Sequence, residues 1–169
     1  RGAASRDEVS AYRSVITSAV AQHNSEDRPM AERDTYGKAF LQTMNLWLVD
    51  EGVKGYTLAR RFARIAAELM GVDRVRLYHD QALYKEAGGG LTPWHQDQYY
   101  WPLGTTNTVT MWMPLVDVSV EMGVMTFASG SHVDGFVGDL PISDESEEKL
   151  RAHVLDKGFR LSEPVDMSA

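Results

Sequence analysis

The hydrophobic periodicity changes at Gly71, and this change limits the folds open to the chain more than any other feature. Residues 58–71 carry apolar side chains at the spacing of one helix face, and Gly71 stands where helices commonly end in a left-handed glycine. After Gly71 come short β-branched and aromatic stretches with turn residues between them, which indicate strands. These stretches are residues 72–80, 81–86, 94–101, 107–116 and 123–130. The sequence therefore predicts helices first and a block of short strands afterwards.

Three other segments have helical features. Ser5 and Glu8 have the spacing of a capping box, and apolar residues recur at helical spacing after them. Residues 37–52 are amphipathic or buried and could form a short helix. Inside the strand region, residues 141–155 begin with Ser143 as a candidate N-cap and carry acids first and bases later. That charge order suits a helix dipole, so we expect a helix there as well.

Composition and charge narrow the class of protein. A chain of 169 residues suits one domain, and no apolar run reaches the ~18–20 residues of a membrane helix, so we expect no membrane partner. The net charge of −7 repels phosphate backbones, so we expect no nucleic-acid partner. No secretory signal is visible and cysteine is absent, which favours a cytoplasmic location. Without cysteine, any metal would be held by His, Asp or Glu.

The stretch TPWHQDQYYW, residues 92–101, places an imidazole and a carboxylate two positions apart. In a strand, side chains at i and i+2 share a face, so His95 and Asp97 would aim at one point and Gln96 at the opposite face. A second His from a distant strand would complete a two-His-one-carboxylate site of the kind that holds iron(II). The same triplet also suits a polar strand end that bonds to neighbouring loops. A zinc hydrolase built on this pair and another His is a third possibility.

Longer stretches around this triplet resemble a known family. LYHDQALYKEAGGGLTPWHQDQYYWP and TVTMWMPLVDVSVEMGVMTFASGSHVDG, between residues 72 and 136, resemble the phytanoyl-CoA dioxygenase family of iron(II)- and 2-oxoglutarate-dependent oxygenases. The resemblance implies a mainly β fold with flanking helices and a double-stranded β-helix core of the jelly-roll or cupin-like type, incomplete at the C-terminus. We expect one oxygenase-like domain over residues 1–169, with a helical N-terminal layer over 1–71 and a partial β-helix core over 72–169.

The resemblance implies roles for single residues. His95 and Asp97 match the first two iron ligands of the family. Residues implied at the cosubstrate are Trp112, Gln96, Lys85 and Gln81, the last two because they lie on the strand that flanks 2-oxoglutarate in relatives. Tyr99, Tyr100 and Trp101 follow the ligands directly and could either wall the substrate pocket or serve as packing aromatics.

Two residues of the family's pattern do not occur in this sequence. Relatives carry a second iron His downstream, followed by an Arg whose guanidinium binds the far carboxylate of 2-oxoglutarate. The sequence ends at Ala169, about where that strand would begin, so we expect a fragment. The remaining histidines, His23, His79, His132 and His153, have no motif that makes one of them a substitute.

The resemblance implies an enzyme that hydroxylates a small organic substrate with O₂, using iron(II) and 2-oxoglutarate and releasing succinate and CO₂. The alternative is a non-catalytic β-helix domain that binds or scaffolds and has lost the distal ligands. The oxygenase interpretation requires that His95 and Asp97 lie side by side.

Overall fold

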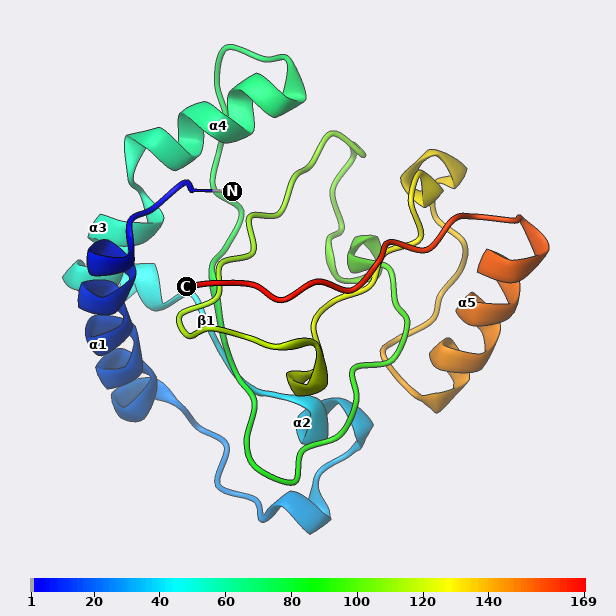
Figure 1. Ribbon diagram of the computed structural model, residues 1–169, viewed down its shortest axis with the longest axis horizontal. Coiled ribbons are helices and arrows are strands. Elements are labelled where there is room, and N and C mark those ends of the chain that lie inside the picture. Colours follow the sequence, from blue (N-terminus) through cyan, green and yellow to red (C-terminus); the bar gives the residue numbers. More distant parts are fainter. Residues whose placement is uncertain (1) are drawn as a thin grey trace.

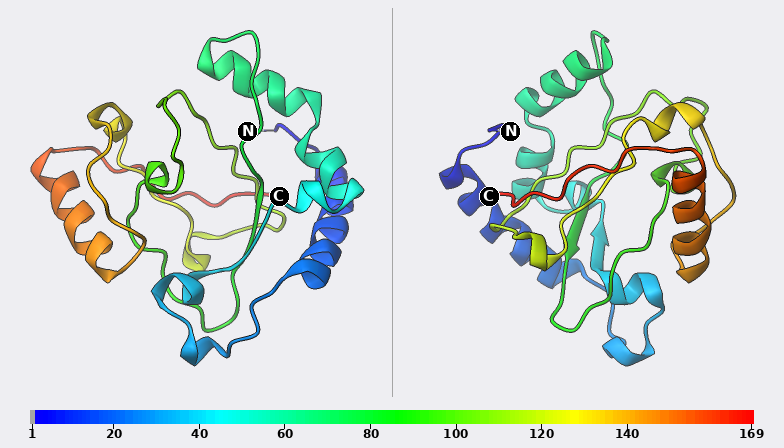
Figure 2. Two further views of the ribbon diagram at one scale, coloured as in Figure 1. Left: turned by 180° about the vertical axis from the view of Figure 1, so that it is seen from behind. Right: turned by 45° about the vertical axis from the view of Figure 1, so that its right-hand side comes forward.

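The structure is a computed structural model that describes residues 2–169. Its α-helices are α1 (Arg6–His23), α2 (Thr35–Ala39), α3 (Glu51–Thr57), α4 (Arg60–Met70) and α5 (Asp144–Asp156), and its strands are β1 (Leu41–Met44) and β2 (Gln81–Tyr84). Short 3-10 helices are η1 (Met30–Glu32), η2 (Leu46–Leu48), η3 (Asp97–Tyr100), η4 (Val120–Met122) and η5 (Ser131–Asp134). In Figure 1, α1, α3 and α4 lie on one side and α5 on the other, with irregular chain between them. Both views of Figure 2 show the same separation.

The helices expected at both ends of the chain and before Gly71 are confirmed. The capping box of α1 has both bonds: Glu8 N donates to Ser5 Oγ at 3.3 Å, and Ser5 N donates to Glu8 Oε2 at 2.9 Å. α4 ends at Gly71, which has the left-handed conformation with φ 65°. Ser143 caps α5 by accepting from Ser146 N at 3.1 Å. Because helices satisfy their backbone groups locally, their sequence signals translate directly into structure.

The single short helix considered for residues 37–52 is wrong. The end of α2, β1, η2 and the start of α3 fill this range instead. β1 pairs with β2 in antiparallel register, from Leu41 opposite Tyr84 to Met44 opposite Gln81. Asn45 then takes a left-handed conformation with φ 59°, which turns the chain out of the strand.

The apolar core lies among α1, η2, α3 and α4. Its buried members are Ile16, Ala19, Leu46, Val53, Tyr56 and Phe62. The Tyr56 ring contacts the Phe62 ring edge-on at a centroid distance of 5.4 Å. From later in the chain, Ala82, Met113 and Leu115 pack against this core. The helical layer (residues 2–71) therefore has a hydrophobic centre of its own.

The predicted mainly β fold with a double-stranded β-helix core is wrong. Across residues 2–169, β1 and β2 form a two-stranded sheet. Outside these strands, isolated β-bridges pair Val118 with Met167 and Ala128 with Leu161. Of the predicted strands, 81–86 contains β2, whereas 94–101 holds the 3-10 helix η3, and 72–80, 107–116 and 123–130 have no named strand.

The reason for this difference is that alternation defines the faces of a strand but not its partner. A strand needs a neighbour that completes its ladder of backbone hydrogen bonds. Val109 and Met111 lie in the predicted strand 107–116, but they remain 44% and 46% exposed because no sheet covers them in the described chain. α5 buries Leu150 and Val154. Within residues 2–169, no helix combines the length and the apolar character needed to cross a membrane.

Candidate functional site

His95 and Asp97 lie where an extended stretch turns into the 3-10 helix η3. Gln96 between them has an extended backbone, with φ −111° and ψ 124°. Side chains on either side of an extended residue point the same way, and His95 Nε2 lies 3.2 Å from Asp97 Oδ1. The structure thus brings the two predicted ligands together, although not in a paired strand of a barrel.

The His95 ring is held by oxygen atoms at both nitrogens. Nδ1 lies 2.8 Å from the Pro93 carbonyl oxygen, and Nε2 faces Asp97. Burial by itself lowers the pKa of His95, but the hydrogen bonds to Asp97 and Pro93 outweigh it, and the pKa lies above its usual value. A backbone carbonyl on Nδ1 is the arrangement that fixes the ring and directs Nε2 at a metal in metalloproteins.

The pair fits one side of a metal site. An imidazole nitrogen and a carboxylate oxygen suit iron(II) and zinc alike. In the described part of the chain, no set of three His, Asp or Glu side chains gathers into a potential metal site. At a metal, His95 and Asp97 would supply two donors.

Gln96 uses both atoms of its side-chain amide on the opposite side. Nε2 donates to the Gly135 carbonyl oxygen at 2.9 Å, and Oε1 accepts from Val137 N at 2.8 Å. The family resemblance implied a cosubstrate contact for this residue. In the structure the amide is bonded to the main chain, and the cosubstrate contact stays a prediction.

Two further contacts attach residues 94–100, which we name the ligand segment, to the chain before and within α5. Trp94 N donates to Glu147 Oε2 at 2.8 Å, and Ile142 N donates to Tyr100 Oη at 2.8 Å. The acids of α5 suggested only a favourable helix dipole, so sequence reasoning missed the role of Glu147. No local pattern links a helix acid to a backbone amide so far along the chain.

The three aromatic residues that could wall a substrate pocket do not form one cluster. Tyr99 and Tyr100 contact each other edge-on at 4.7 Å between ring centroids. Trp101 packs instead against Tyr78 and His79, with distances between ring centroids of 6.3 Å and 6.1 Å. Their role in substrate binding stays a prediction.

The three other predicted cosubstrate residues lie in or just after β2 and on irregular chain, and their role stays a prediction. Lys85 Nζ donates to the carbonyl oxygens of Gly90 at 2.6 Å and Ala39 at 3.3 Å, and burial lowers the pKa of its ammonium group. Gln81 begins β2 and is exposed, and Trp112 is partly exposed on irregular chain. Among residues 2–169, none of the three bonds to His95 or Asp97.

Tyr36 is a residue near the pair that the sequence did not suggest. It lies on α2, and its hydroxyl donates to Gln42 Oε1. Burial raises the pKa of the Tyr36 phenol, and the nearby Tyr100 and Asp97 raise it further. The missing signal was α2 itself, because Asp34, which caps it by accepting from Gly37 N at 2.7 Å, was not recognised as an N-cap.

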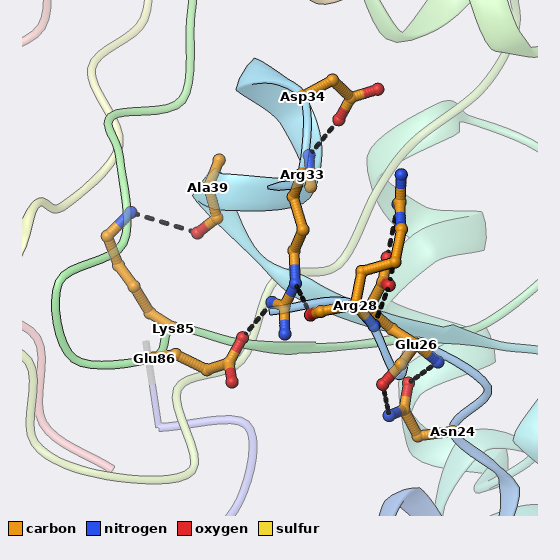
Figure 3. Close-up of polar contacts among 9 residues, drawn as sticks. Asn24, Glu26, Arg28, Arg33, Asp34, Ala39, Lys85 and Glu86 are labelled. Atoms are coloured by element: carbon orange, nitrogen blue, oxygen red, sulfur yellow. Dashed lines mark hydrogen bonds and ion pairs between the residues drawn. The ribbon is translucent and has the colours of Figure 1, made fainter. Parts of the chain in front are cut away.

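A buried guanidinium ties the helical layer to the end of β2. Arg33 Nε donates to the Arg28 carbonyl oxygen at 2.9 Å, and Nη1 pairs with the Glu86 carboxylate (Figure 3). Figure 3 also shows Lys85 reaching the carbonyl of Ala39 beside this pair. The chain that follows β2 is therefore fixed to α2 and to the loop before it.

One comparison with known proteins identifies a family for this chain. A family model described as Phytanoyl-CoA dioxygenase (PhyH) matches residues 1–158, which include the N-terminal helices as well as the His95–Asp97 pair. No curated protein and no solved structure matches the chain significantly. The resemblance found in the sequence is confirmed.

Proposed function

Because the chain belongs to the phytanoyl-CoA dioxygenase family, we propose that it is an iron(II)- and 2-oxoglutarate-dependent oxygenase that hydroxylates a small organic substrate. Members of this family are in general 2-oxoglutarate-dependent dioxygenases that use iron(II). The observation that carries the proposal for this chain is the approach of His95 Nε2 to Asp97 Oδ1 at 3.2 Å.

His95 and Asp97 would hold the metal. The Pro93 carbonyl holds Nδ1–H of His95, which leaves the Nε2 lone pair for coordination once its proton is lost. The Asp97 carboxylate offsets part of the metal's charge. Bound iron(II), with 2-oxoglutarate and O₂, supplies an oxidation in which one oxygen atom enters a substrate C–H bond and the other enters succinate, with loss of CO₂.

Tyr36 would lie at the edge of this site, with its O–H donated to Gln42 Oε1. α2 positions it from the helical layer, whereas the ligand segment comes from the other region. The site would therefore be formed where the two regions meet.

An anaerobic titration tests the proposal. Iron(II) and 2-oxoglutarate are added to the purified chain, and the weak visible charge-transfer band of the bound cosubstrate is followed. We expect the band in the unaltered chain and its loss in His95→Ala and in Asp97→Ala. His132→Ala, which removes an imidazole on η5, is the matched control and should keep it.

One observation favours a second candidate, a non-catalytic binding domain. In residues 2–169, the pair lacks a third His, Asp or Glu that would complete a three-ligand site. This candidate predicts no charge-transfer band and no succinate release with any substrate tested. A band that depends on His95 and Asp97 would exclude it.

A further inference from the structure

The residue between the two proposed ligands makes the most specific contact of the ligand segment. Gln96 lies between His95 and Asp97 in the chain, and its side chain points to the opposite side of the backbone from theirs. Both polar atoms of its amide are satisfied, by Gly135 O at 2.9 Å and Val137 N at 2.8 Å. Nothing in the proposed chemistry requires this contact.

The contact has the form of a strand pairing made by a side chain. The carbonyl before Phe136 and the N–H after it point the same way when the chain is extended, and a neighbouring strand would normally bind both. The Gln96 amide offers one donor and one acceptor in the matching order. The Gln96 side chain thus bonds to a carbonyl and an N–H two residues apart, as a neighbouring strand would.

Gly135 makes the contact possible from the other side. Its φ of 72° and ψ of −152° are a conformation that only glycine adopts readily, and a Cβ built there would meet no atom within 4 Å. The requirement for glycine is therefore conformational. It directs the Gly135 carbonyl at Gln96 without any crowding.

We propose that Gln96 is a positioning residue. Its hydrogen bonds to the backbone at Gly135 and Val137 keep His95 and Asp97 turned toward a common metal. The inference rests on the proposed function. Trp94 and Tyr100 anchor the ends of the ligand segment, but within residues 94–100 Gln96 is the anchor that stands between the two ligands. Without it, the peptide planes on both sides of residue 96 are free to rotate, and the imidazole and carboxylate separate.

Binding of Mn(II), a spectroscopic stand-in for iron(II), tests this role without turnover. Free Mn(II) is measured by electron paramagnetic resonance during titration of the unaltered chain and of Gln96→Leu, which keeps the size but loses both bonds. Loss of a group that orients a metal ligand typically weakens metal affinity about 10- to 100-fold, and we expect that range here. Gly135→Ala should weaken binding in the same way, and the double variant should be no weaker than Gln96→Leu alone.

Three controls separate positioning from general destabilisation. Gln98→Leu removes a glutamine whose side chain bonds to Trp101 O, directly after η3, at 3.2 Å, and Gly138→Ala adds a methyl group in open space. Ile16→Val lowers the stability of the distant core. All three should keep the affinity for Mn(II), even where the thermal midpoint of the metal-free protein falls as far as in Gln96→Leu.

The outcomes distinguish the two proposals. If the unaltered chain binds Mn(II) through His95 but Gln96→Leu changes the affinity by less than about twofold, the positioning role is wrong and the proposed function stands. If the unaltered chain does not bind Mn(II), or His95→Ala binds equally well, the proposed function is wrong and the positioning role with it. If Gln96→Leu does not fold, Gly135→Ala carries the same expectation and the same threshold.

Discussion

The helical layer and residues 72–169 are held together by different forces. The first region encloses large apolar side chains such as Leu46 and Phe62, and it forms a continuous core. In residues 72–169, the buried large apolar side chains are Leu150 and Val154 on α5. The ligand segment is attached instead by hydrogen bonds from side chains to main chain, at Trp94, Gln96 and Tyr100.

This difference shows where precision at the site comes from. Apolar burial is strong but has little directionality, whereas hydrogen bonds depend on angle and distance. The His95–Asp97 pair lies in the region that relies on hydrogen bonds. We therefore expect substitutions in the helical layer to change stability most, and substitutions around the ligand segment to change local geometry most.

The largest effect should follow from opening the core of the helical layer. Leu46 is 2% exposed and lies in the central cluster, so Leu46→Ala should lower the free energy of unfolding by about 2–5 kcal/mol. Phe127, which is 56% exposed, is the matched position in the other region, and Phe127→Ala should change it by less than about 1 kcal/mol. Urea unfolding measures both, and equal losses would contradict the comparison.

The next effect concerns the contact that joins the regions. Arg33 has a side-chain exposure of 7%, so Glu86→Ala leaves a buried guanidinium without its carboxylate and should cost about 1.5–3 kcal/mol of unfolding free energy. The exposed pair of Lys54 and Glu51 offers a control, because Glu51→Ala should cost less than about 1 kcal/mol. Chemical denaturation distinguishes the two, and a silent Glu86→Ala would show that the regions are joined elsewhere.

A smaller and more local effect is expected at the ligand segment. Glu147→Ala removes the acceptor of Trp94 N–H and should cost about 1 kcal/mol, with faster hydrogen exchange at the Trp94 amide. Glu148→Ala, the exposed neighbour on α5, should leave that amide unchanged. Exchange that is equally fast in both variants would mean that this bond does not hold the segment.

The smallest effect is a pH dependence of the metal-free protein. The pKa of His95 lies above its usual value of 6.5, so the folded state holds this proton more tightly than the unfolded state does. The resulting stability is present in full below pH 6.5 and is lost as the pH rises through the folded-state pKa. Thermal midpoints across this range should fall more for the unaltered chain than for Asp97→Asn, and parallel curves would argue against the ion pair.

The sequence predicted what depends on neighbours along the chain. The ends of α1, α4 and α5 followed from Ser5, Gly71 and Ser143, because caps and helix faces are set within a few residues. The proximity of His95 and Asp97 followed from one extended residue between them. Their role as iron ligands stays a prediction, as does a single domain over residues 1–169.

The sequence did not predict what depends on distant partners. Gln96 reaches residues 39 and 41 positions away, and Trp94 reaches one 53 positions away. The β-helix was expected from the family resemblance, and short strands were expected from β-branched and aromatic stretches. Such stretches contain no information on which segment completes the ladder. Tyr36 was missed for a local reason instead, because Asp34 was not recognised as the N-cap of α2.

The pairing of β1 with β2 delays one step of folding during synthesis of this protein. Leu41 pairs with Tyr84, and both α3 and α4 lie between them in the chain. On the ribosome, β1 therefore emerges well before β2 has been translated. Until then, the N–H and C=O groups that β1 will pair with β2 have no strand partner. Folding of the two helices in the interval shortens the effective loop that must close when β2 arrives. A nascent chain paused between Met44 and Gln81 exposes an open strand edge, and this is the stage at which a chaperone would have most to protect.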